Sequence, residues 1–187
     1  MDFTIDHYGW DQVGPFPIVK GSIDADLKQL NVLFDVKEPD IRAVHTIHNQ
    51  PVCEDSCVEL FFSPYISDSE TRYINIEVNP IGTVFASIGT GRYDRSLLTN
   101  EQIGSLDIKT KINRGTALIH WTVQYMIPFS LLAEVYKLEP IKECKEIICN
   151  MYKCGDKLPK PHWGSRKPVN TDKPDFHRPE YFTKFLL

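Results

Sequence analysis

Hydrophobic and polar side chains alternate along two neighbouring stretches of the chain, 56–63 and 71–79. Side chains two positions apart lie on the same face of a β-strand. The alternation therefore predicts two strands, each with one face toward a core and an opposite face that carries carboxylates, amides and aromatic rings. The predicted core faces consist of Val58, Leu60, Phe62, Ile74, Ile76 and Val78, and the predicted opposite faces of Cys57, Glu59, Phe61, Tyr73, Asn75, Glu77 and Asn79.

Strand signals dominate the rest of the chain, and turn residues such as those at 79–82, 89–91 and 113–115 separate them. Helix signals are limited to one short stretch after Pro128, which could open a single turn. Many short strands with almost no helix predict an all-β fold: an antiparallel β-sandwich of jelly-roll or immunoglobulin-like type, formed by a single domain, 1–187. The seven further strands are expected at 27–36, 41–47, 83–88, 106–111, 117–127, 145–153 and 181–187.

A proline-rich stretch, 158–179, precedes the last predicted strand and resembles a linker in its composition. It also carries Trp163, His162, Phe176 and His177, side chains that a solvated linker rarely contains. We therefore expect an ordered loop that packs on the domain.

Composition narrows the classes of partner. The chain has 187 residues, of which 42% are hydrophobic and 25% charged, with a net charge of -4, so it lacks the basic surface that nucleic acid requires. No apolar run predicts a membrane span, and no secretory signal is recognisable at the N-terminus. The compartment stays open: extracellular or periplasmic if a leader was removed, otherwise cytoplasmic. The five cysteines fall mostly in apolar strands, which predicts buried reduced thiols rather than a disulfide framework.

The polar faces of the first two strands have the chemistry that a sugar requires. The short connection between the strands predicts an antiparallel pair, so Glu59 is expected close to Asn75 or Glu77. Carboxylates and amides can each bond two neighbouring hydroxyls, and an aromatic ring can cover the apolar face of a pyranose. The same pattern is also typical of the solvated face of a sandwich, so the pattern alone leaves both interpretations open.

Four strings, in order along nearly the whole chain, resemble the family 9-like carbohydrate-binding modules, which belong to a DOMON-related superfamily. They are EDSCVELFF at 54–62, YINIEVN at 73–79, YKCGD at 152–156 and KPDFHRPEYF at 173–182. The resemblance implies a jelly-roll-like sandwich that binds a mono- or oligosaccharide without chemistry of its own. It also implies service in the degradation of polysaccharides such as xylan, with a glycoside hydrolase as a partner in the same system.

The resemblance also implies site residues. Relatives clamp a sugar ring between two tryptophans and bind it through a Glu, an Arg and an Asn. Glu59 matches that Glu, the strand with Tyr73, Asn75, Glu77 and Asn79 supplies further polar groups, and Trp163 lies in the late loop that holds one tryptophan, near Arg166. The arginine has no counterpart, because Arg72 has the wrong strand parity. Trp121 is expected in the core, and Trp10 could be the second plate only if the N-terminal segment covers the site. Relatives can also bind structural calcium, for which Asp68 and Glu70 are candidates.

Three alternatives remain at this point. Glu59 and Glu77 could form the carboxylate pair of a retaining glycosidase, which needs a separation of about 5 Å. His45, His48, Cys53 and Cys57 have residue types that bind metals, although strand parity would direct the two histidines to opposite faces. Haem would need a pair of axial ligands, for which Met126, Met151 and His120 are the candidates. In addition, Asp175 could orient His177, although a loop lock is the simpler role.

Overall fold

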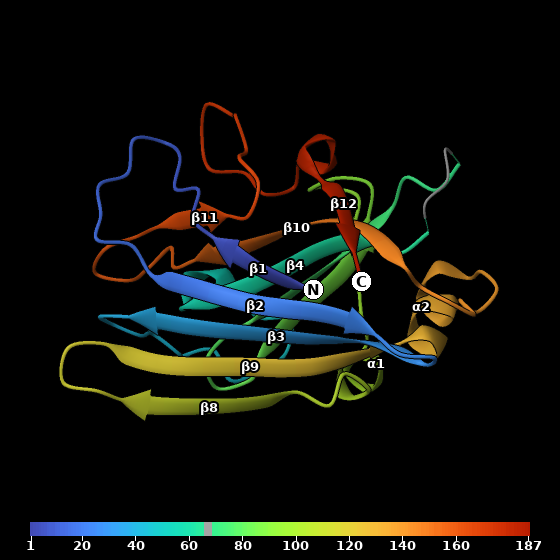
Figure 1. Cartoon of the computed structure of the whole chain (residues 1–187), viewed down its shortest axis with the longest axis horizontal. Coiled ribbons are helices and arrows are strands. Elements are labelled where there is room, and N and C mark those ends of the chain that lie inside the picture. The colour runs from blue at the N-terminus through green and yellow to red at the C-terminus, as the bar shows by residue number, and fades with distance from the viewer. Residues whose placement is uncertain (66–68) are drawn as a thin grey trace.

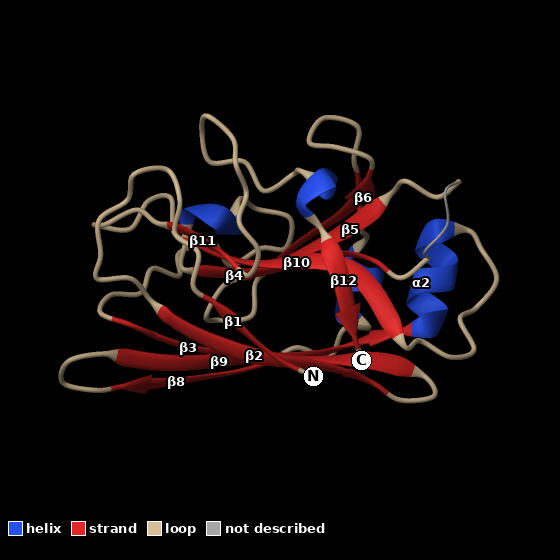
Figure 2. Cartoon of the chain, turned by 45° about the horizontal axis from the view of Figure 1, so that its top comes forward, coloured by secondary structure: helices blue, strands red, loops and turns tan. Residues whose placement is uncertain are grey.

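The chain folds into two antiparallel β-sheets stacked face to face, as the computed structural model shows for residues 1–65 and 69–187 (Figures 1 and 2). The first sheet has the order β1 (Asp2–Ile5), β2 (Ile18–Ala25), β3 (Gln29–Glu38), β9 (Ile119–Pro128) and β8 (Lys109–Arg114). The second has the order β11 (Trp163–Ser165), β10 (Glu146–Cys154), β4 (Cys57–Ser63), β5 (Tyr73–Val78), β6 (Val84–Gly89) and β7 (Ser96–Leu97), and β12 (Thr183–Leu186) also pairs with β10. The predicted β-sandwich is confirmed.

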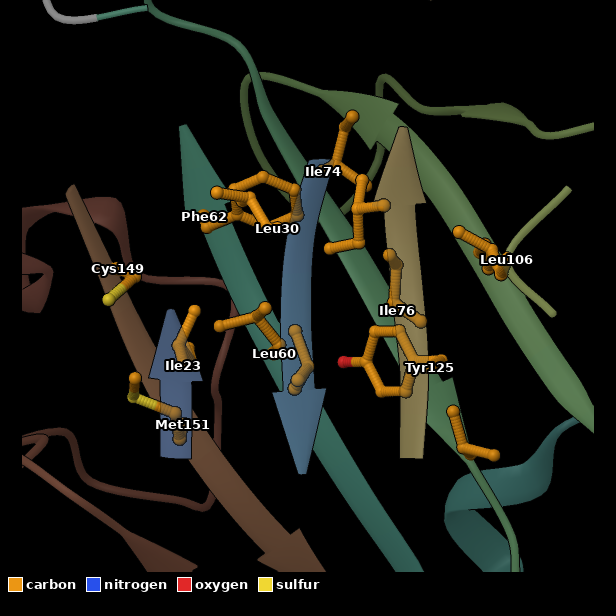
Figure 3. Packing of buried hydrophobic residues seen from close by; sticks show 14 of the residues in the cluster. Ile23, Leu30, Leu60, Phe62, Ile74, Ile76, Leu106, Tyr125, Cys149 and Met151 are labelled. Atoms are coloured by element: carbon orange, nitrogen blue, oxygen red, sulfur yellow. The ribbon is translucent and has the colours of Figure 1, made fainter. Parts of the chain in front are cut away.

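The core lies between the sheets and is built by alternate residues of each strand. From the second sheet Leu60, Phe62 and Ile76 point inward, and they meet Tyr125 of β9 and Leu30 of β3 (Figure 3). All are 1% exposed or less. Burial of each such side chain stabilises the fold by about 1.5–3 kcal/mol, so a slip of one residue in either strand would exchange the two faces at a large cost. The core face predicted for 56–63 and 71–79 is confirmed, as is the core position of Trp121.

The helical signal at Pro128 belongs to a longer element than predicted. Helix α2 (Phe129–Tyr136) starts directly after Pro128 and buries Phe129, Leu131, Leu132 and Tyr136. A second helix, α1 (Asn100–Gly104), was not predicted; it begins with a capping box in which Thr99 and Gln102 each satisfy the other's backbone N–H. Two short 3-10 turns, η1 (Val52–Glu54) and η2 (Pro179–Tyr181), complete the helical elements of the described chain.

Several predicted strands also differ from the structure. The stretch 41–47 is not a strand, because the carboxylate of Asp55 accepts hydrogen bonds from the backbone N–H groups of Val44 and His45, at 3.0 Å each, in place of a neighbouring strand. Conversely, the N-terminal strands β1 and β2 were missed. Their sequence mixes Gly, Lys and Asp with isolated apolar residues, so the pairing with β3 decides their conformation.

The proline-rich stretch 158–179 is ordered and packs on the outer face of the second sheet, as predicted. Its Val169 and Phe176 are buried in a second apolar cluster with Phe61, Tyr73 and Tyr152 of that face. Phe176 stacks on Tyr152 with ring centroids 4.1 Å apart. The face opposite the core is therefore partly roofed by chain, and the remaining opening forms a cavity.

Candidate functional site

A cavity of about 480 Å³ opens on the outer face of the second sheet. Its floor comes from the central strands, where Glu59, Glu77, Phe85 and Cys154 face outward. Its walls come from the loop between β6 and β7, from the turn after β10 and from the 158–179 segment. The wall side chains include Arg92, Tyr93, Asp156, Trp163, Asp175 and His177.

The predicted meeting of the carboxylates on one patch is confirmed by the sheet register. Glu59 of β4 lies directly opposite Glu77 of β5. Asn75 lies two positions along β5 on the same face, and its Nδ2 donates a hydrogen bond to Glu77 Oε1 at 2.8 Å. Directly opposed residues in antiparallel strands have Cβ atoms about 4.5–5.5 Å apart, so the two carboxyl groups share one local environment.

Burial changes the acidity of this carboxyl pair. It raises the pKa of Glu77 to about 7, an effect that the hydrogen bond from Asn75 and the charge of Arg95 partly offset. It also raises the pKa of Glu59 well above its usual range, and the neighbouring Glu77 adds to the shift. A protonated carboxyl group donates as well as accepts, so the floor offers both halves of a hydroxyl's hydrogen bonding.

Two arginines that the sequence analysis did not select contribute to the site. Arg95 donates from Nε to Ser87 Oγ at 2.8 Å and from Nη2 to Asn75 Oδ1 at 2.5 Å, and its guanidinium lies 4.3 Å from the ring centroid of Tyr73. Arg92 is held at the cavity wall by Asp175, at 2.6 Å. In the sequence, Arg92 and Arg95 were marked only by their position beside the glycine-containing turn at 89–91, between two predicted strands.

Aromatic side chains line the cavity on more than one side. Trp163 is half-buried, and its Nε1 donates to Asp156 Oδ1 at 2.8 Å, which fixes the indole plane. Tyr93 also lines the cavity and is 96% exposed. Trp10 does not line this cavity; its Nε1 bonds the carbonyl of Thr171, and its ring packs at 6.0 Å from Phe176.

Some predicted site residues have other contacts. Tyr73 lies beneath the cavity, with its hydroxyl 2.9 Å from His177 Nδ1. Asn79 bonds Asp55 and the backbone N–H of Thr83, so it holds the β5–β6 turn. Arg166 extends over the ring of Phe185, away from the cavity lining.

The whole-chain comparison decides the family. A family model described as carbohydrate-binding family 9 matches residues 2–187. The chain belongs to carbohydrate-binding family 9. A comparison with curated proteins found no match.

Solved structures support the same family-9 fold. A Bacteroides uniformis protein, provisionally described as carbohydrate-binding, is similar with a TM-score of 0.87 and 27% identity, over 98% of this chain and 84% of that one. A family 9 module from Caldicellulosiruptor kristjanssonii in complex with cellotriose has a TM-score of 0.65 at 12% identity, covering 100% and 81% of the two chains. The same organism's module with glucose has a TM-score of 0.58 at 13% identity, covering 93% and 78%. This chain is thus a carbohydrate-binding module.

Within this family 9 module the alternative histidine–cysteine metal set does not come together. His45 Nε2 lies 3.2 Å from Glu54, and His48 Nδ1 accepts from the backbone of Val84. The parity argument that separated these histidines was wrong, because 41–47 is not a strand. In the described part of the chain a different group, Cys57, Glu59 and Cys154, brings its possible ligand atoms within 4.8 Å of one another. All five cysteines are free, and four of them are buried.

The calcium, haem and histidine hypotheses concern other parts of the module. Asp68 lies outside the described residues, and both oxygens of Glu70 accept from Arg72, so calcium there stays a prediction. Of the haem candidates, Met151 is buried in the core. His120 and Met126 both lie on β9 of the first sheet, where His120 pairs with Asp35 at 2.8 Å. Asp175 accepts from the backbone N–H of His177 and pairs with Arg92 and Arg178, which makes it a loop lock.

No helix among residues 1–65 and 69–187 is both long and apolar enough to cross a membrane.

Proposed function

We propose that the cavity above Glu59 and Glu77 is the carbohydrate site of this module, and that it holds a terminal glucose-like ring of a short oligosaccharide. The observation that carries the proposal is the convergence of two opposed carboxyl groups, two guanidinium groups and a half-buried indole around one opening. The predicted Asn75 lies beneath the lining, 0% exposed, and bonds both Glu77 and Arg95. A volume of about 480 Å³ lies within the range of small-ligand pockets, roughly 300–1,000 Å³.

Each group has a distinct task in this proposal. Trp163 covers the apolar face of the ring, and its bond to Asp156 keeps the indole in place before the sugar arrives. Glu77 and Glu59 bond hydroxyls from the floor. Arg92, restrained by Asp175, offers a fork of N–H donors to the ring from the wall. The ligand is gluco-configured in this proposal because two structurally similar modules are described in complex with cellotriose and with glucose.

We also propose that binding is not followed by glycoside cleavage. A glycosidase needs one ionised and one protonated carboxyl group, which requires environments that drive the two pKa values apart. Here burial raises the pKa of Glu77 to about 7 and that of Glu59 well above its usual range, so neither environment favours the ionised carboxylate that a nucleophile requires. A glycoside hydrolase would then supply the chemistry as a partner, as the family resemblance implies.

Calorimetric titration with glucose, cellobiose, cellotriose and xylobiose tests the site. We expect dissociation constants of roughly micromolar to millimolar, because a sugar offers few atoms and must lose bound water. Trp163→Ala should weaken binding by about 1–3 kcal/mol, since the stacking partner is lost. His120→Ala, on the outer face of the other sheet, is the matched control and should bind as the wild type does.

An unchanged affinity in Trp163→Ala would place the sugar elsewhere. Product analysis after long incubation with the same oligosaccharides tests the absence of cleavage, and release of a shorter sugar that Glu77→Gln abolishes would contradict it.

A further inference from the structure

Two cysteines lie beside Glu59 at the floor of the cavity, and the proposed carbohydrate binding does not use them. Cys57 and Cys154 are direct partners in the register between β4 and β10, and Glu59 is two positions along β4 from Cys57 on the same face. The three are at most 2% exposed. Their possible ligand atoms, two sulfurs and a carboxylate oxygen, all lie within 4.8 Å of one another.

We infer that Cys57, Cys154 and Glu59 form a binding site for one zinc ion at the base of the cavity. Two thiolates and a carboxylate are ligands that Zn²⁺ accepts, whereas calcium and magnesium prefer oxygen alone. Tetrahedral zinc, with Zn–S distances of about 2.3 Å, places two thiolate sulfurs about 3.8 Å apart. The observed separations therefore need an adjustment of only about an ångström at the side chains.

The geometry leaves one coordination position toward the cavity. Glu59 and Cys154 both line the cavity, while Cys57 is sealed beneath them, so the three ligands approach the ion from the sheet and the fourth position faces the opening. We expect a water molecule in that position. Three protein ligands and an open position distinguish this arrangement from a closed structural zinc site, which has four.

The ligand side chains already point toward one another without a metal. Cys154 Sγ donates a hydrogen bond to Glu59 Oε1 at 2.9 Å, so the thiol is directed at the carboxylate. A bound metal deprotonates its thiol ligands outright, and the two central strands supply a rigid frame for them.

The zinc site shares Glu59 with the proposed carbohydrate site, but zinc binding and sugar binding are measured separately. Zinc bound by a chain that binds no sugar would leave this inference intact, and sugar bound by a chain that binds no zinc would refute only this inference.

The test uses the full chain, reduced, stripped with a chelator and titrated with Zn²⁺ against a chromophoric competitor. We expect one zinc per chain, and after Co²⁺ substitution a thiolate-to-cobalt charge-transfer band with the intense visible absorption of tetrahedral cobalt. Cys57→Ser and Cys154→Ser should each weaken zinc binding by more than about 100-fold, since loss of even an outer-shell partner costs about 10–100-fold.

Cys149→Ser is the matched control, because Cys149 is a buried free cysteine on β10 that faces the core instead. It should bind zinc as the wild type does. Circular dichroism establishes which variants fold. Glu59→Gln replaces any serine variant that does not fold, and Glu59→Gln should also bind zinc more weakly than the wild type. Three results would overturn the inference. The first is less than one zinc per reduced wild-type chain. The others are wild-type affinity in a folded Cys57→Ser, Cys154→Ser or Glu59→Gln chain, and loss of zinc binding in Cys149→Ser.

Discussion

A lysine buried between the two sheets provides the sharpest test of how this fold is held together. Lys153 of β10 is 0% exposed and its Nζ lies 3.1 Å from Glu38 Oε2 of β3, which is 1% exposed. The same ammonium is 2.9 Å from His162 Nε2 and donates to the carbonyl of Cys154 at 2.8 Å. The other Glu38 oxygen accepts from the indole N–H of Trp121 at 2.7 Å.

The magnitude follows from this geometry. Two unit charges 3.1 Å apart attract by about 5 kcal/mol at an effective dielectric constant of about 20. Desolvation of both ions offsets most of that gain, but removal of one partner leaves the other buried and unpaired, which costs about 3–5 kcal/mol. We therefore expect Lys153→Met to destabilise the fold by about 3–5 kcal/mol. A second change, Glu38→Gln, should recover part of the loss, because it removes the stranded charge and keeps an acceptor for Trp121.

Urea unfolding followed by tryptophan fluorescence measures this effect. With a denaturant slope of about 2 kcal/mol per M, the midpoint of Lys153→Met should fall by roughly 1.5–2.5 M. The double variant should have a higher midpoint than Lys153→Met alone. If the double variant is no more stable than that single variant, or if Lys153→Met costs less than about 1 kcal/mol, the charge pair does not have the role described.

Three further outcomes are expected. Arg95→Ala should weaken glucose binding at least about tenfold in calorimetry, because it releases Asn75, whereas Arg166→Ala, outside the cavity lining, should not weaken it. Equal effects of the two substitutions would contradict the placement of the site. Burial, with the charge of Lys153 adding to it, lowers the pKa of His162 to about 3, although Glu38 Oε2 lies 3.8 Å from its Nε2; the neutral form therefore stabilises the fold above about pH 6.5, and that contribution is lost as the pH falls toward 3. The advantage of wild type over His162→Gln should shrink by up to about 1.4 kcal/mol per pH unit in unfolding measurements between about pH 6.5 and pH 4, and a constant difference would refute this. Gly21→Ala should destabilise the fold by about 1–3 kcal/mol in thermal unfolding, because a Cβ there would come within 2.3 Å of Leu33 O, while Gly104→Ala, with open space around it, should not. A destabilisation by Gly21→Ala of less than about 1 kcal/mol would show that the β2–β3 contact relaxes.

Local alternation was enough to predict which faces of the central strands meet the core. Leu60 and Ile76 were placed inward and Glu59 and Glu77 outward because a strand repeats every two residues, a property that each segment carries by itself. The ordered 158–179 loop was predictable for a similar reason, since its aromatic side chains must be buried somewhere. The strand expected at 41–47 failed because Asp55, which follows it by several residues, satisfies its backbone instead.

The sequence by itself thus determined the β-sandwich, the parity of its central strands and, through the four family strings, the class of ligand. Only the tertiary structure decided which distant groups meet. Cys154 reaches Glu59 from 95 positions away, and Arg95 supports Asn75 through the β6–β7 loop, whereas Arg166 lies outside the cavity. These contacts depend on sheet order and register, which are set by the packing of the whole core and leave no periodic signal in any single segment.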